Sequence, residues 1–117
     1  MGHYRHHVII IVPETEAVSK RIYKKAVSLF GKNMVSKPLS SPINGYKTIY
    51  IGPDGAKEGS EESDEYDKKR ERFLNYLNFN KSVNESAYVV MTMGRDSNLD
   101  TDIEETTYPI DWKKRIG

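Results

Sequence analysis

The chain has 117 residues, a formal net charge of +1 and a hydrophobic content of 37%. This length and composition predict one globular domain over 1–117, with 95–117 as a peripheral C-terminal tail. Basic and acidic residues number 18 and 17, so we expect neither nucleic acid nor a membrane as a partner. There is no cysteine, which excludes thiolate chemistry and cysteine–zinc sites and is typical of a reducing cytoplasm.

The first predicted elements are a strand and a helix. Residues 8–12 are continuously apolar and β-branched, which predicts a strand buried on both faces and central in its sheet. The run is far too short to cross a bilayer. From 14 to 30 the apolar residues recur at helical spacing. Thr15 suits the N-cap of this helix, and Gly31 suits a left-handed C-cap.

A hairpin is predicted next. Residues 32–44 contain two prolines, which remove backbone donors, so a strand here must be short and at a sheet edge. Asn44-Gly45 is a strong hairpin signal that leads into a strand over 46–51. Isoleucine and tyrosine alternate in that strand. We expect the isoleucine face to pack on the core and the face with Tyr46 and Tyr50 to be half-exposed.

The second half predicts a charged helix and two more strands. Ser63 is a suitable N-cap for a helix that ends near residue 79. Residues 87–93 are almost entirely apolar and predict a strand, whereas the acidic stretch that follows predicts none until a short edge strand over 106–110. The only tryptophan, Trp112, is expected to dock the C-terminal tail on the core.

This element order is the βαββαβ plan of an α+β, ferredoxin-like fold, with an antiparallel sheet and both helices on one face. The other sheet face is then bare and is a candidate binding or oligomer surface. We expect Tyr46, Tyr50, Tyr88 and Met91 or Met93 to help to line it. The alternative is a three-layer arrangement in which the C-terminal tail covers that face.

A candidate anion site lies where the 46–51 strand meets the second helix. A glycine-rich turn and a helix N-terminus together can form a concave corner that favours anions. Arg70 falls on the apolar stripe of the helix. Either its stem packs while its head reaches water near neighbouring acids, or it holds an anion in a pocket. Lys57 either balances nearby acids or contributes to the same site. The predicted ligand-binding residues are Lys57, Arg70, Gly55, Gly59, Tyr50 and Tyr88.

Catalytic and metal sites find little support in the sequence. His6 and His7 would point to opposite faces of a strand and would not converge with His3 on one metal ion. The chain has no pair of His-x-Thr or His-x-Ser motifs, no nucleophile elbow and no Walker loop. We therefore favour a protein without enzymatic activity and expect no metal or cofactor.

The chain also resembles a group of small, functionally unassigned proteins encoded by tailed bacteriophages. The shared features are the start HYRHHVIIIV, an NGY strand, and a PDG-x-KEG-x-x-ESD segment that precedes a charged helix. The resemblance covers about residues 3–77, while the C-terminal third matches poorly. It implies a viral accessory protein in the host cytoplasm, and it carries over no catalytic residue.

Three functions are considered on these grounds. The leading hypothesis is a non-enzymatic binder that sequesters a small anionic, nucleotide-type signal of host immunity as a homo-oligomer. The second is a protein–protein inhibitor of a host defence enzyme. The third is a small hydrolase that uses the N-terminal histidines.

Overall fold

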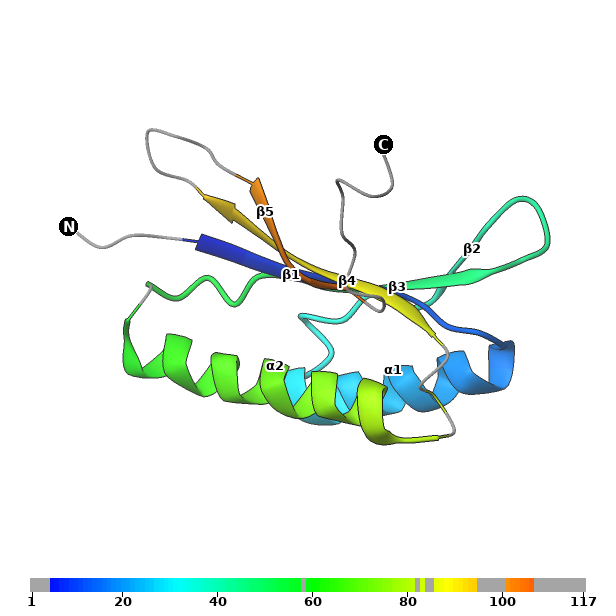
Figure 1. Cartoon of the computed structure of the whole chain (residues 1–117), viewed down its shortest axis with the longest axis horizontal. Helices are drawn as coiled ribbons and strands as arrows, with labels where there is room; N and C mark the ends of the chain where they lie inside the picture. The colour runs from blue at the N-terminus through cyan, green and yellow to red at the C-terminus, as the bar shows by residue number, and fades with distance from the viewer. Residues whose placement is uncertain (1–4, 58, 82, 84–85, 95–100, 107–117) are drawn as a thin grey trace, which may run out of the picture.

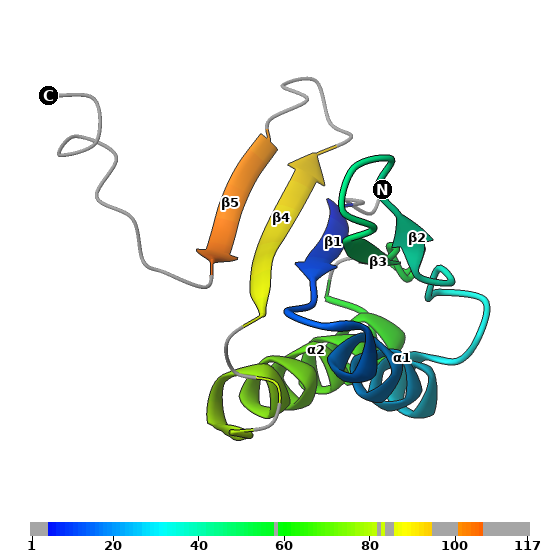
Figure 2. The same ribbon diagram turned by 90° about the vertical axis from the view of Figure 1, so that its right-hand side faces the viewer.

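The computed structural model describes residues 5–57, 59–81, 83, 86–94 and 101–106. The elements in chain order are β1 (Arg5–Val12), α1 (Glu16–Phe30), β2 (Leu39–Ser40), β3 (Lys47–Ile51), α2 (Glu61–Phe79), β4 (Ala87–Gly94) and β5 (Thr101–Thr106). The strands form one antiparallel sheet in the order β2-β3-β1-β4-β5. Figures 1 and 2 show both helices on the same side of this sheet. The chain is therefore α+β and compatible with a ferredoxin-like fold, although its strand count and order differ from the four-stranded βαββαβ plan.

Helix α1 has the predicted caps. The backbone N–H of Val18 donates to Oγ1 of Thr15, with the two atoms 3.1 Å apart, so Thr15 satisfies one of the unpaired donors of the first turn. Gly31 ends the helix at φ 83°, a conformation that only glycine adopts without strain. The helix begins at Glu16, two residues later than expected.

The hairpin between β2 and β3 is also confirmed. Asn44 and Gly45 both have positive φ angles, 65° and 66°, as a tight hairpin turn requires. β2 is only two residues long and lies at the edge of the sheet. This is the position where the flanking prolines cost no ladder hydrogen bonds.

The predicted start of α2 is wrong by three residues. Ser60 is the N-cap, and Ser63 instead donates its backbone N–H to Oγ of Ser60 at 3.2 Å. Gly59 directly before it adopts a φ of 82°, which turns the chain into the helix earlier. Ser63 is then carried into the first turn, where its side chain is buried.

The last strand also differs from the prediction. β5 covers Thr101–Thr106 and pairs with β4, so part of the predicted peripheral tail belongs to the sheet. Pairing at an edge depends on backbone N–H and C=O groups, and an acidic sequence can supply those as well as an apolar one. The predicted strand over 106–110 mostly falls, with Trp112 and the proposed tail docking, outside the described residues.

One face of the sheet packs on the helices and forms the core. Ile9 and Ile11 of β1 are fully buried there, and the register places them opposite Ile51, Ile49, Val90 and Tyr88. Phe73 and Leu77 of α2 pack against this layer from the helix side. The prediction that residues 8–12 are buried on both faces is wrong, because Val8, Ile10 and Val12 lie on the opposite face and are only partly buried.

Neither described helix lies on the opposite face of the sheet, which we call the open face (Figure 2). Registers and strand alternation place on it His6, Val8, Ile10, Val12, Leu39, Tyr46, Thr48, Tyr50, Ala87, Val89, Met91 and Met93. Tyr88 is not among them. It pairs with Ile11, faces the helices and donates from its hydroxyl to Oδ1 of Asn78 at 3.0 Å. The prediction that Tyr88 shares a face with Tyr50 is therefore wrong.

Candidate functional site

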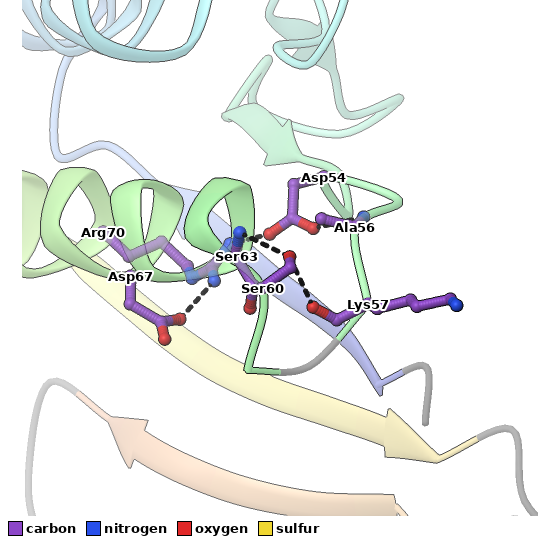
Figure 3. A network of polar contacts seen from close by, with 7 residues as sticks. All are labelled: Asp54, Ala56, Lys57, Ser60, Ser63, Asp67 and Arg70. Atoms are coloured by element: carbon purple, nitrogen blue, oxygen red, sulfur yellow. Dashed lines mark hydrogen bonds and ion pairs between the residues drawn. The ribbon is translucent and has the colours of Figure 1, made fainter. Parts of the chain in front are cut away.

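The predicted corner between β3 and α2 exists as a pocket of about 350 Å³ lined by Asp54, Gly55, Ala56, Lys57, Ser60, Glu62 and Tyr66. Two glycines shape its loop, with φ angles of 80° at Gly55 and 82° at Gly59. Within the loop, Oδ1 of Asp54 accepts the backbone N–H of Ala56 at 2.8 Å. The backbone oxygen of Lys57 then accepts a hydrogen bond from Oγ of Ser60, and Oγ of Ser60 accepts one from the backbone N–H of Ser63 at the start of α2 (Figure 3).

Arg70 is buried beside this pocket and is fully engaged by protein carboxylates. Its Nη1 lies 2.9 Å from Oδ2 of Asp54, and its Nη2 contacts Oδ1 of Asp67. The side chains of Arg70 and Asp54 are 7% and 4% exposed. The guanidinium therefore neither reaches water nor holds an outside anion. It fixes the loop after β3 to the third turn of α2 through a desolvated ion pair.

Lys57 and Arg70 do not converge. Figure 3 shows the Lys57 side chain extending away from the Asp54–Arg70 pair, and Lys57 is exposed. The pocket wall also contains the carboxylate of Glu62, which opposes an anion there. The remaining predicted ligand residues, Tyr50 and Tyr88, lie on opposite faces of the sheet. The structure thus disperses the six predicted residues over three places.

A second and larger concavity lies at the other end of α2, and sequence reasoning missed it. It is shallow and largely open to solvent, has a volume of about 740 Å³ and is lined by Lys25, Arg72, Asn75, Tyr76, Phe79, Asn80 and Lys81. We call it the α1–α2 groove, because Lys25 comes from α1 while the other lining residues come from α2 and the two residues after it. Phe79 is 81% exposed, an unusual position for a large apolar side chain.

The α1–α2 groove is electropositive. Lys25, Arg72 and Lys81 line it, and none of its lining residues is acidic. Among the residues that the structure describes, none of these three cations takes part in an ion pair. Lys25 Nζ instead lies 5.5 Å from the ring centroid of Tyr76, a cation–π contact.

Tyr76 adds an aromatic wall that stays neutral. Burial raises the pKa of its hydroxyl above the usual value, and the nearby Arg21 cation lowers it by a smaller amount. The phenol is therefore protonated at neutral pH, where it can donate a hydrogen bond and adds no negative charge.

A pattern in the sequence does mark this groove. Arg72, Tyr76 and Phe79 follow each other at spacings of four and three, so they share one face of α2. That face lies beside the core stripe and carries a cation with two aromatic rings. Lys25 cannot be joined to them from sequence, since its place in the groove depends on how α1 packs against α2.

Other chemistries find no support in the part of the chain that the structure describes. No group of three or more histidine, aspartate or glutamate side chains there could hold a metal ion. His6 and His7 lie opposite Met93 and Thr92 and so face opposite sides of the sheet. Neither described helix is long and apolar enough to cross a membrane.

Comparison with known proteins adds no assignment. No protein-family model matches the chain, and no curated protein matches its sequence.

Proposed function

We propose that the chain is a phage-encoded, non-enzymatic accessory protein that sequesters a small anionic ligand of the nucleotide type in the host cytoplasm. The observation that supports this most directly is the α1–α2 groove, where three cations and two aromatic rings meet without a carboxylate. We place the ligand in this groove and not in the corner beside Arg70.

The groove offers the two kinds of contact that a nucleotide needs. Lys25, Arg72 and Lys81 provide charged donors for phosphate oxygens. Phe79 offers an exposed ring on which a base can stack, a contact worth about 1–3 kcal/mol per base. Each charge-assisted hydrogen bond adds about 1.5–3 kcal/mol. The C-terminal end of a helix dipole disfavours anions by only about 0.3–1 kcal/mol, so the three cations prevail.

The corner has a structural role in this proposal. The guanidinium of Arg70 is already paired with the carboxylate of Asp54. A ligand would have to displace that buried carboxylate to reach the guanidinium.

The fold in this proposal is a ferredoxin-like βαββαβ unit formed by β1 to β4 with both helices, and β5 is added at its edge.

Isothermal titration calorimetry with adenosine and guanosine mononucleotides and dinucleotides tests the site. We expect Arg72→Ala to weaken binding by at least about tenfold, which corresponds to the loss of one charge-assisted contact. Phe79→Ala should weaken nucleotide binding but leave the weaker binding of inorganic phosphate unchanged. Mass spectrometry of small molecules released by heating the protein, purified from host cells with active defences, would identify the natural ligand.

Lys57→Ala is the matched control, because it removes one exposed cation from the corner and leaves the groove intact. Full affinity in this variant, together with lost affinity in Arg72→Ala, supports the groove. The opposite result would move the ligand to the corner, and no binding of any probe by the folded wild-type protein would contradict the proposed function.

A further inference from the structure

We propose that the open face is a self-association surface, on which a second copy of the chain packs face to face. This inference goes beyond the proposed function, because it concerns the side of the sheet that carries neither the groove nor the corner. It follows from the composition of the face, from the way the sheet edges are protected, and from the symmetry that such a face allows.

The open face is largely apolar where its side chains are described. Tyr46 is 55% exposed, Tyr50 41%, Leu39 55% and Met93 38%, and Ile10 lies between Tyr50 and Val89 in a row across the sheet. The described residues of this face in β1 to β4 include no Asp, Glu, Lys or Arg, although charged residues make up 30% of the whole chain. A continuous apolar patch of this kind marks an interaction site.

The edges of the sheet are poorly suited to association, which leaves its face. β2 offers only two residues for pairing, and prolines lie near both its ends. By sequence, β5 contains three acids among six residues, so two β5 edges would bring like charges together. Short strands, prolines and charges are the devices by which proteins block pairing between edges.

A second copy suits this face better than a different protein does. Two-fold symmetry brings the same patch together with itself, so like charges on a patch would repel. The open face has no such charges in its described part, and equally has no charge pattern that would select a particular foreign partner. The apolar surface alone is enough for an isologous contact.

The size of the face is that of a small interface. Strands lie about 4.8 Å apart and rise about 3.3 Å per residue, so the 29 strand residues of the sheet present roughly 460 Å² in projection. A face covered with side chains exposes more than its projection, so two such faces together bury roughly 1,000 Å², the lower limit for a specific interface. The two sheets would pack about 10 Å apart, as in a β-sandwich.

Sedimentation-velocity ultracentrifugation and light scattering of the full chain test this proposal. We expect the wild-type protein to have twice the 13.5 kDa mass of one chain. Tyr50→Lys should convert it to a monomer, because a cation would be buried unpaired at the interface. Met93→Lys, at the other side of the face, should do the same. Circular dichroism of each variant establishes that it is folded.

Ile43→Lys is the matched control. Ile43 is 77% exposed in the turn between β2 and β3, so the same change in charge there should leave the dimer intact. A monomeric wild-type protein would overturn the proposal, whether the C-terminal segment or nothing covers the face. A dimer that persists in both folded face variants would overturn it as well, and so would a dimer lost equally in Ile43→Lys.

Discussion

Arg70 shows that a residue whose sequence pattern suggests ligand binding can instead have a structural role. On sequence it is a cation on an apolar stripe, with Tyr66 four residues before it and Phe73 three residues after it. In the structure its guanidinium is buried and bridges Asp54 and Asp67, and no described buried side-chain nitrogen or oxygen is left without a hydrogen-bond partner. The anion that Arg70 holds is supplied by the protein itself, from a loop sixteen residues away in the chain.

Replacing Arg70 should therefore destabilise the fold strongly. Arg70→Met keeps much of the packed stem but leaves the carboxylate of Asp54 buried without a cationic partner, which typically costs about 3–5 kcal/mol. The free energy of unfolding, measured by urea denaturation, should fall by this amount.

Two companion variants sharpen the experiment on Arg70. Asp67 is 52% exposed, so Asp67→Ala should cost less than about 1 kcal/mol. The double variant Arg70→Met with Asp54→Ala should recover part of the loss, because it removes the unpaired charge. Equal costs for Arg70→Met and Asp67→Ala would show that the Asp54 contact is unimportant.

Strand β1 illustrates the difference between the two faces at the level of one element. Its isoleucines look alike in sequence, yet Ile9 and Ile11 are fully buried against the helices while Ile10 is only partly buried on the open face. A run of β-branched residues indicates a strand but does not reveal whether both of its faces are covered, since that depends on what packs on the second side.

Substitutions in β1 should reproduce this asymmetry. Ile9→Ala removes a side chain from the closed core and should lower the free energy of unfolding by about 2–5 kcal/mol. Ile10→Ala should cost clearly less when the chain is monomeric, because its side chain keeps some contact with water. Urea denaturation of both variants in the Tyr50→Lys background makes the comparison at the level of the monomer. Equal losses would contradict the assignment of the two faces.

At the scale of the whole molecule, the sheet lies between the proposed ligand site and the proposed self-association surface. The α1–α2 groove is lined by residues of α1, of α2 and of the two positions after α2. Figure 1 shows both helices on one side of the sheet, and the open face is the other side. In a face-to-face dimer the helices of both copies point outward. The two grooves are then at opposite sides of the assembly, and neither copy contributes a residue to the groove of the other.

Ligand binding should consequently be independent in the two copies. We expect calorimetry with the best mononucleotide probe to give one site per chain and a Hill coefficient near one. Tyr50→Lys should leave the affinity unchanged while it abolishes the dimer. A large change of affinity in this variant would show that association and ligand binding are coupled.

The sequence predicted the regular elements well, because their signals are local. The caps of α1, the turn at Asn44-Gly45 and the isoleucine face of β3 each depend on neighbouring residues. The start of α2 was predicted three residues too late, because Ser63 also has a side chain that suits an N-cap and the local sequence does not show that the chain turns at Gly59. β5 was missed because an edge strand is defined by backbone pairing and needs no apolar pattern.

The candidate site was harder to predict, because its contacts join distant residues. The pairing of Asp54 with Arg70 depends on where the loop after β3 meets α2. The position of Lys25 in the same groove as Arg72 and Tyr76 depends on how α1 packs against α2. Hydrophobic periodicity describes each element alone and carries no information on contacts between elements.

The central place of β1 has a consequence for the order in which the protein can be built. β1 leaves the ribosome before β3 and β4, yet it pairs with both of them. It therefore stays apolar and only half-paired until β4 (Ala87–Gly94) has emerged. Folding of such long-range pairs is slow and leaves strands exposed to aggregation. The need for protection by chaperones should therefore be greatest before β4 has been synthesised.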